Sequence, residues 1–166
     1  EADVGQALAA HRHVALVSAT GSVAMGRSVA QTVAARLGRS LLELGGNNGI
    51  IVSKKADLDL ALKGVTFSFF CTSGQRCTSL RRLFLHESIA NYFETKLIAA
   101  LKTLRVGDPR DEHVLCGPLI DKNAFAQFQQ AIKTAQAQGG QLLYGGERIK
   151  KDVPGGGYYV QPAVIA

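Results

Sequence analysis

The alternation of short apolar runs with longer segments of helical spacing predicts an α/β fold for this chain of 166 residues. Residues 14–17 are a valine-rich run, which is typical of a buried parallel strand. A glycine turn and a helical pattern over residues 23–37 follow it, and Gly38 is expected to end that helix. A second strand and helix are expected at residues 82–86 and 88–104.

The remaining elements follow from capping residues and breakers along the chain. Asp57 and Ser88 are suited to begin helices, since short polar side chains accept hydrogen bonds from the first free N–H groups. We expect further helices at residues 2–10, 58–70 and 121–138. We expect further strands at residues 40–44, 49–52, 141–144 and 158–165, the last preceded by a glycine loop at the surface.

Composition narrows the classes of function. Nearly half of the residues (46%) are hydrophobic, which is enough to bury a core. The net charge is +6, but lysine and arginine are spread along the chain without a dense basic run, so a basic face is favoured over a nucleic-acid interface. The three cysteines have no metal-ligand spacing, and no metal is expected. No signal peptide or membrane span is visible, which predicts a cytoplasmic protein without a membrane partner.

The polar segment at residues 72–78, Thr-Ser-Gly-Gln-Arg-Cys-Thr, presents a candidate nucleophile, Cys77. Positive charge, here from Arg76 and two arginines downstream, favours the thiolate that attacks. Gly74 permits a tight turn, after which the Cys77 N–H can face an oxygen that gains charge during a reaction. The alternative is a buried, inert cysteine.

A second candidate is Glu43, which lies between two leucines in the stretch Leu-Glu-Leu-Gly-Gly-Asn-Asn at residues 42–48. Burial raises the pKa of a carboxyl group and suits it to act as a general base near neutral pH. The alternative is an alternating strand with Glu43 on its solvent face. For Asn47 and Asn48 a purely structural role in the turn is open, because asparagine tolerates positive φ.

Taken together, ELGG and GQRC resemble the two active-site signatures of the NAD(P)-dependent aldehyde dehydrogenases. Residues 18–26 resemble the turn F-T-G-S-x-x-x-G that contacts the cofactor pyrophosphate in that family. GDP at residues 107–109 and GPL at 117–119 extend the resemblance. GGNN and GQRCT are most similar to the α-aminoadipic semialdehyde dehydrogenase, or antiquitin-like, branch.

The resemblance implies part of a Rossmann-type nucleotide-binding domain joined to part of an α/β catalytic domain. Residues 1–45 correspond to the C-terminal part of the NAD(P)-binding domain. Residues 46–166 correspond to a catalytic domain that is incomplete at its C-terminus. We therefore expect the chain to be an internal piece of a longer enzyme.

The resemblance also implies the cofactor and its contacts. NAD is expected, with NADP as a possible alternative. The expected cofactor-binding residues are Gly5, Gln6, Thr20, Gly21, Ser22, Gly26, Glu43 and Leu44. For Ser22 a simple helix cap is the competing interpretation.

The reaction that the resemblance implies is oxidation of an aldehyde to the carboxylic acid. Cys77 forms a covalent thiohemiacetal and then a thioester, and Glu43 activates the water that releases the acid. Arg76 and Thr78 are expected to contact the substrate, because a guanidinium suits an aldehyde that carries a carboxylate, such as an amino-acid semialdehyde of lysine catabolism. Two other roles stay open for Arg76: it could lower the pKa of Cys77, or it could form a surface salt bridge. A small-molecule aldehyde is the only partner expected besides a homo-oligomer, dimer or tetramer, of the full-length enzyme.

Two rival hypotheses remain at the level of sequence. In one, the chain is a catalytically incompetent fragment that lacks the family's oxyanion-binding asparagine and later cofactor-binding glutamate. In the other, it is a basic nucleic-acid-binding module.

Overall fold

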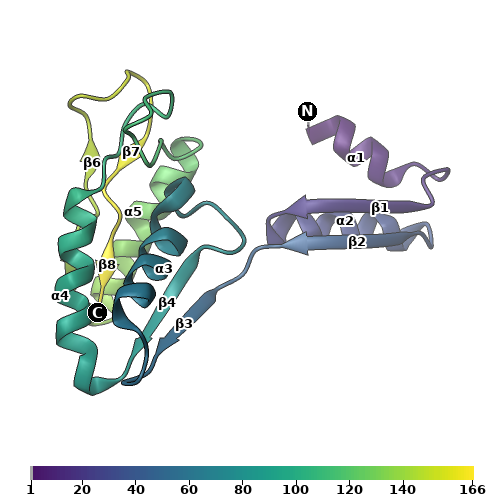
Figure 1. The fold of residues 1–166 in the computed structure, drawn as a ribbon. Helices are drawn as coiled ribbons and strands as arrows, with labels where there is room; N and C mark the ends of the chain where they lie inside the picture. The colour runs from purple at the N-terminus through teal and green to yellow at the C-terminus, as the bar shows by residue number, and fades with distance from the viewer. Residues whose placement is uncertain (1) are drawn as a thin grey trace. The chain divides into compact units, whose positions relative to one another are not determined.

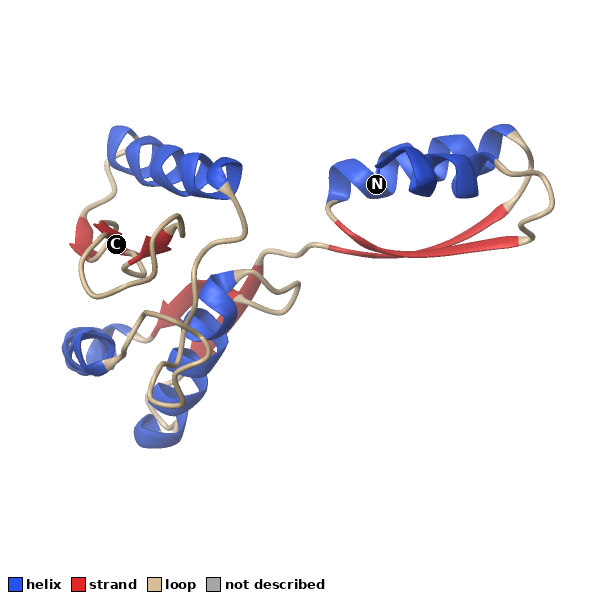
Figure 2. Ribbon diagram, turned by 90° about the horizontal axis from the view of Figure 1, so that it is seen from above, coloured by secondary structure: helices blue, strands red, loops and turns tan. Residues whose placement is uncertain are grey.

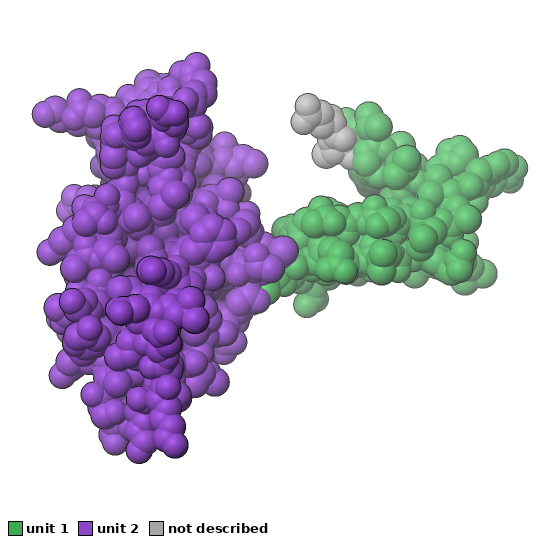
Figure 3. All heavy atoms as spheres, in the orientation of Figure 1, with its two compact units in different colours: residues 1–46 green, residues 47–166 purple. Residues whose placement is uncertain are grey.

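The computed structural model describes residues 2–166, and the chain divides into two compact units (Figure 3). Unit 1 ends at Gly46, and unit 2 runs from Asn47 to Ala166. Strands and helices alternate in both units, which confirms the α/β class (Figure 1). Which domain of a longer enzyme each unit forms stays a prediction.

Unit 1 is a pair of parallel strands with helices on one face (Figure 2). Its elements are α1 (Ala2–Ala10), β1 (Leu16–Gly21), α2 (Val23–Ala35) and β2 (Arg39–Leu44). The register runs from Leu16 opposite Arg39 to Gly21 opposite Leu44. Ala9, Val17 and Val33 form a small buried core between the sheet and the helices.

The ends of α2 show how local sequence sets its length. Ser22 caps the N-terminus, since its Oγ accepts the Met25 N–H at 3.1 Å. At the C-terminus the left-handed residue is Leu37 (φ 56°), and the N–H of Gly38 donates to the carbonyl of Val33. This is a Schellman motif with leucine where glycine is usual, so the helix ends before Leu37 and Gly38 is not the residue that reverses the chain.

Unit 2 combines a parallel pair of strands with two short antiparallel pairs. The parallel pair is β3 (Asn48–Val52) and β4 (Leu80–Leu85), joined by α3 (Leu58–Phe70) and a short 3-10 helix, η1 (Cys71–Gly74). Helices α4 (Glu87–Thr103) and α5 (Lys122–Ala137) follow β4. The antiparallel pairs are β5 (Leu142–Tyr144) with β8 (Val164–Ile165) and β6 (Arg148–Ile149) with β7 (Tyr159–Val160).

The core of unit 2 lies where α3 and α4 pack against one face of β3 and β4 (Figure 1). Its buried members come from strands, helices and the segment after α4: Val52, Val65, Phe70, Leu80, Phe93, Leu97, Leu101 and Cys116. The opposite face of the strand pair carries Ile51, which is 82% exposed, and Phe84. Among residues 2–166, no helix has the length and apolarity that a membrane span requires.

Several expected elements differ from the structure, and β4 begins at Leu80 instead of residue 82. The first strand begins at Leu16 instead of residue 14. Helix α4 is capped by His86, whose Nδ1 accepts the Ser88 N–H at 3.2 Å, so Ser88 is not the cap. The strand expected at 158–165 is broken into β7 and β8 around Pro162, which has no N–H for a ladder, and the short strand β6 was not expected.

The buried side chain of Leu101 in α4 should contribute strongly to the stability of unit 2. Leu101 is 1% exposed, whereas Leu60 in α3 is 67% exposed. We expect Leu101→Ala to lower the free energy of unfolding by about 2–5 kcal/mol. The control Leu60→Ala should change it by no more than about 0.5 kcal/mol. All four tyrosines lie in unit 2, so denaturant titration followed by tyrosine fluorescence reports on this unit. Equal effects of the two substitutions would contradict the packing described.

Candidate active site

Cys77 lies in a turn whose closing residue is completely buried. The Ser79 N–H donates to the carbonyl of Arg76 at 3.1 Å, and the Ser79 Oγ accepts the Arg76 N–H at 3.0 Å. Ser79 is 0% exposed, while the Cys77 side chain is exposed. The turn is therefore anchored by Ser79 and presents the Cys77 thiol at the surface, and a buried position for Cys77 is excluded in this chain.

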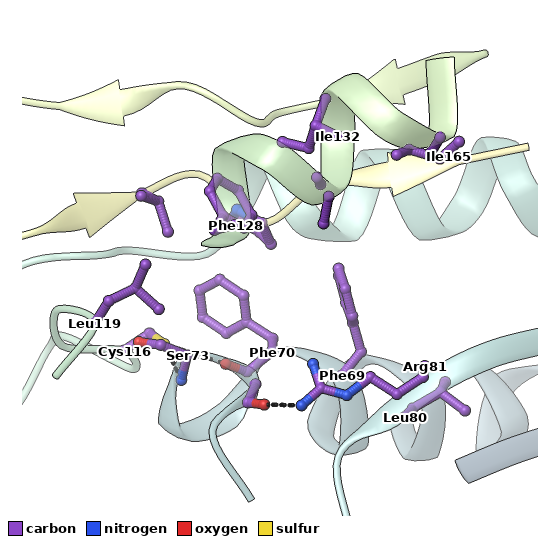
Figure 4. A pocket seen from close by; sticks show the side chains of 16 residues that line it. Phe69, Phe70, Ser73, Leu80, Arg81, Cys116, Leu119, Phe128, Ile132 and Ile165 are labelled. Atoms are coloured by element: carbon purple, nitrogen blue, oxygen red, sulfur yellow. Dashed lines mark hydrogen bonds between the residues drawn. The ribbon is translucent and has the colours of Figure 1, made fainter. Parts of the chain in front are cut away.

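The backbone just before this turn is left-handed at three consecutive positions, residues 72–74, with φ of 57°, 54° and 66°. Such a conformation costs a residue with a side chain roughly 1–2 kcal/mol. Hydrogen bonds hold it: the Ser73 N–H donates to the Cys116 Sγ at 3.0 Å, and the Ser73 hydroxyl donates to the Gly117 carbonyl at 2.7 Å. The Cys116 thiol in turn donates to the Phe70 carbonyl at 3.1 Å. Ser73 and Cys116 lie side by side in Figure 4.

Two further side chains fasten the segment that leads to Cys77. The Gln75 Oε1 accepts the N–H of Ile120 at 2.9 Å, which ties the segment to the residue that follows the Gly-Pro-Leu stretch at 117–119. The Arg81 guanidinium donates to the carbonyl of Gly74 at 2.7 Å (Figure 4). The nucleophile segment is thus also held by residues that follow it in the chain.

The arginines near Cys77 are engaged with backbone carbonyls. The Arg76 guanidinium lies over the Phe67 ring, 5.1 Å from its centroid, and donates to the Phe67 carbonyl at 3.3 Å. Arg82 donates to the carbonyl of Asn47 at 2.7 Å. Arg76 acts on a neighbouring thiol: burial raises the pKa of Cys71, and the charge of Arg76 offsets part of that increase.

Glu43 is exposed, so burial of this carboxylate is wrong for this chain, and the alternative of an alternating strand with Glu43 on its solvent face is the one observed. The alternation of β2 places Glu43 on the face opposite Leu42 and Leu44, and Glu43 lies beside Thr20 in the parallel register. Glu43 belongs to unit 1 and Cys77 to unit 2.

The expected cofactor residues cluster in unit 1. Gly5 and Gln6 of α1 line a cavity of about 440 Å³ together with parts of β1 and α2. Thr20, Gly21 and Ser22 form the turn that ends β1 and begins α2, although the Ser22 Oγ is used as the helix cap.

Gly26 and Leu44, two further expected cofactor residues, contact each other. A Cβ at Gly26 would lie 2.5 Å from the Leu44 Cδ2, so the absent side chain at Gly26 lets β2 approach α2. This contact is a packing role that the sequence did not indicate.

A separate cavity of about 360 Å³ lies in unit 2 between η1, α5 and the C-terminal strands. Phe128 and Ile132 of α5 face Phe70 and Leu119 across it (Figure 4). Cys77 is not among the residues that line it, so this apolar cavity is not the space in front of the thiol. Within residues 2–166, no group of three or more histidine, cysteine or acidic side chains is placed to hold a metal ion.

The comparison with protein families decides the assignment. The model of the aldehyde dehydrogenase family matches residues 1–166. The chain belongs to the aldehyde dehydrogenase family. This confirms the expected resemblance to that family.

Individual relatives are consistent with this assignment. The chain is 47% identical over 164 residues to α-aminoadipic semialdehyde dehydrogenase of Mus musculus, covering 99% of this chain and 30% of the mouse protein. It is 43% identical to aldehyde dehydrogenase family 7 member B4 of Arabidopsis thaliana, of which it covers 32%. The chain thus spans about a third of the length of these relatives, and the expected similarity to the α-aminoadipic semialdehyde dehydrogenase branch is confirmed.

Solved structures show the same fold. Betaine aldehyde dehydrogenase of Staphylococcus aureus in complex with NAD+ matches 97% of this chain, and 32% of its own length, with a TM-score of 0.92 at 30% identity. Lactaldehyde dehydrogenase of Escherichia coli matches 98% of this chain, and 33% of its own length, with a TM-score of 0.91 at 34% identity. The expected aldehyde dehydrogenase-like fold is therefore confirmed.

The sequence did not indicate the contacts by which Asn48 and Ser79 hold the Cys77 turn and Cys116 holds the segment before it. Ser79 is a buried polar residue two positions after the nucleophile, and its adjacency to the motif was the available signal. Cys116 and Asn48 act across 43 and 29 positions of sequence, and no local pattern reveals such contacts.

The three cysteines should react with an alkylating agent in the order Cys77, Cys71, Cys116. Cys77 is exposed, Cys71 is half-buried and Cys116 is buried with its thiol hydrogen-bonded. Because the pKa of Cys71 is raised, its reaction should keep accelerating at higher pH than that of an ordinary thiol. Iodoacetamide labelling followed by peptide mass spectrometry measures the order. In denaturant all three should react alike; faster reaction of Cys71 or Cys116 in the native chain would contradict the structure.

Proposed function

We propose that this chain supplies the nucleophile and the general base of a longer NAD-dependent aldehyde dehydrogenase that oxidises an aldehyde to the acid. The observation that carries the proposal is the exposed Cys77 thiol on a turn anchored by buried Ser79, in a chain that belongs to the family. The turn presents a thiol at a fixed position, as nucleophilic catalysis requires.

In the first step the Cys77 thiolate adds to the carbonyl carbon of the aldehyde. The new C–S bond forms as the carbonyl electron pair moves to oxygen, which becomes an oxyanion. The Cys77 N–H is suited to donate a hydrogen bond to this oxyanion. The Arg76 carbonyl points into the turn, where it accepts the Ser79 N–H, and the trans peptide between Arg76 and Cys77 holds its C=O and its N–H on opposite sides. The N–H therefore points away from the inside of the turn.

The residues of unit 1 fit a dinucleotide. The cavity beside Gly5 and Gln6 adjoins the turn at the N-terminus of α2, where the first N–H groups have no intrahelical acceptor and the helix dipole favours a phosphate. Ser22 holds this end of the helix through its cap and leaves backbone N–H groups for the pyrophosphate. When bound, NAD would accept the hydride that leaves the former aldehyde carbon, while the oxyanion electron pair re-forms the C=O bond and leaves a thioester on Cys77. The Staphylococcus aureus relative is a complex with NAD+, and NADP remains an alternative.

Glu43 is assigned the second half of the reaction, release of the acid. Its carboxylate takes a proton from water, the water oxygen adds to the thioester carbon, and the C–S bond breaks to return the Cys77 thiolate. Its position on the exposed face of β2, beside Thr20, leaves it accessible to water.

For the substrate we propose an amino-acid semialdehyde. The support is the mouse relative, which is named α-aminoadipic semialdehyde dehydrogenase. Thr78 is exposed beside Cys77 and can contact such a substrate directly. Arg76, whose guanidinium lies over the Phe67 ring, stays the candidate for a substrate carboxylate. A homo-oligomeric form, dimer or tetramer, and a cytoplasmic location stay predictions.

Substitution of the two catalytic residues should separate the two halves of the reaction. In the complete enzyme that carries this chain, Cys77→Ala should abolish NADH formation. Glu43→Gln should retain a rapid first turnover of NADH and slow the later turnovers by about 10²–10⁴-fold, because only acid release needs the base. Stopped-flow absorbance of NADH measures both phases.

The control for these variants is Cys71→Ala, which removes a neighbouring thiol that has no assigned role. It should retain both phases. Unchanged turnover in Cys77→Ala would refute the proposed function, and loss of the first turnover in Glu43→Gln would refute the role given to Glu43.

A further inference from the structure

We propose that Asn48 is a positioning residue for Cys77: its side-chain amide fixes the peptide groups on which the nucleophile stands. The inference rests on the proposed function, since it adds a residue to the same site. Neither the resemblance nor the reaction assigns a role to this side chain. From the sequence, a purely structural role for Asn48 in the turn after β2 was open.

The parallel pairing of β3 and β4 brings Asn48 to the nucleophile. Asn48 is the first residue of β3 and lies opposite Leu80, the first residue of β4. Parallel strands start at the same edge of a sheet, so the start of β3 lies beside the residues that immediately precede β4. Those residues are the turn from Arg76 to Ser79.

The contact itself is made by one amide group with two carbonyls. The Asn48 Nδ2 donates to the Cys77 carbonyl at 2.6 Å and to the Ser79 carbonyl at 2.9 Å. A side-chain amide has two N–H donors, and both are used here. Asn48 is half-buried, and it joins strand β3 to the backbone of the nucleophile itself.

The two hydrogen bonds determine how the peptide after Cys77 is oriented. The Cys77 carbonyl points to Asn48, so the planar peptide directs the Thr78 N–H the opposite way. The Ser79 N–H fixes the peptide before Cys77 by donating to the Arg76 carbonyl, and the Ser79 Oγ accepts the N–H of the peptide one position earlier. Both peptide groups that flank the Cys77 Cα are therefore held, and with them the direction of its Cα–Cβ bond and the N–H proposed for the oxyanion.

A neighbouring residue provides a matched control. Asn47 is also an asparagine, but it is exposed, and only its backbone carbonyl is engaged, by Arg82. Asn48→Asp removes both donors with little change in shape and places a carboxylate against two carbonyls. Asn47→Asp makes the same chemical change one position away, so it controls for the added negative charge.

The experiment measures kcat, the KM for NAD and the rate of the first turnover in the complete enzyme that carries this chain. Misplacement of a reacting group by about 1 Å can cost about 10²-fold in rate. We expect Asn48→Asp to lower kcat and the first turnover by about 10–10²-fold. The KM for NAD should stay within about twofold of the wild-type value, because Asn48 contacts the Cys77 turn and lies outside the cofactor cavity. Asn47→Asp should behave as wild type.

A second variant keeps the test decisive if Asn48→Asp does not fold. Asn48→Ala removes the amide without adding charge, and it should show the same loss of kcat with an unchanged KM for NAD. A melting curve of each variant separates misplacement from unfolding, since a purely structural role predicts a lower melting temperature with wild-type kcat in the folded fraction.

The outcomes distinguish this inference from the proposed function. An active wild-type enzyme with full activity in both Asn48 variants would overturn the role of Asn48 and leave the proposed function intact. Equal losses in Asn47→Asp and Asn48→Asp would also overturn it, because a general charge effect would then explain both. A wild-type enzyme whose activity does not depend on Cys77 would refute the proposed function itself.

Discussion

The parallel pairing of β3 with β4 is the constraint on which the candidate nucleophile depends. Two parallel strands cannot be joined by a tight turn, so the chain must cross over between them, and here it does so through α3 and η1. The crossover returns to the edge of the sheet where β3 began, and the last residues before β4 form the Cys77 turn. The nucleophile is thus placed by strand register, with the buried Ser79 as the nearest anchor.

The three cysteines show how environment sets the behaviour of one type of side chain. Cys77 is exposed on the turn, where its thiol can meet a small molecule. Cys116 is buried and works as a hydrogen-bonding group, donating to the Phe70 carbonyl and accepting the Ser73 N–H. Cys71 lies between these extremes, with a pKa raised chiefly by burial. Exposure and hydrogen bonding, rather than residue type, single out Cys77 as the candidate nucleophile.

The parts of the fold that local chemistry determines could be predicted from the sequence. Asp57 begins α3, as its capping side chain indicated, and Ser22 caps α2, which was the competing interpretation for that residue. Prediction from local sequence failed where two nearby residues could both cap a helix: His86 caps α4 in place of Ser88. It also failed at the C-terminal end, where Pro162 interrupts the ladder.

The candidate site was predictable in its motifs but not in its contacts. The position of Cys77 in a glycine-bearing turn followed from the sequence, whereas the engagement of Arg76 with the Phe67 ring did not. The burial expected for Glu43 was wrong, because alternation in β2 turns its side chain away from the covered face. The hydrogen bonds of Asn48 join residues far apart in sequence, and only the register of the sheet reveals them.

The most direct test of the central claim is to isolate the covalent intermediate on Cys77. The complete enzyme with Glu43→Gln would be mixed with NAD and a small aldehyde, quenched with acid and digested for peptide mass spectrometry. The account predicts that the peptide containing Cys77 gains the mass of the acyl group as a thioester, while the peptides of Cys71 and Cys116 stay unmodified. An acyl group on Cys71, or NADH formed with no acyl group on Cys77, would contradict it.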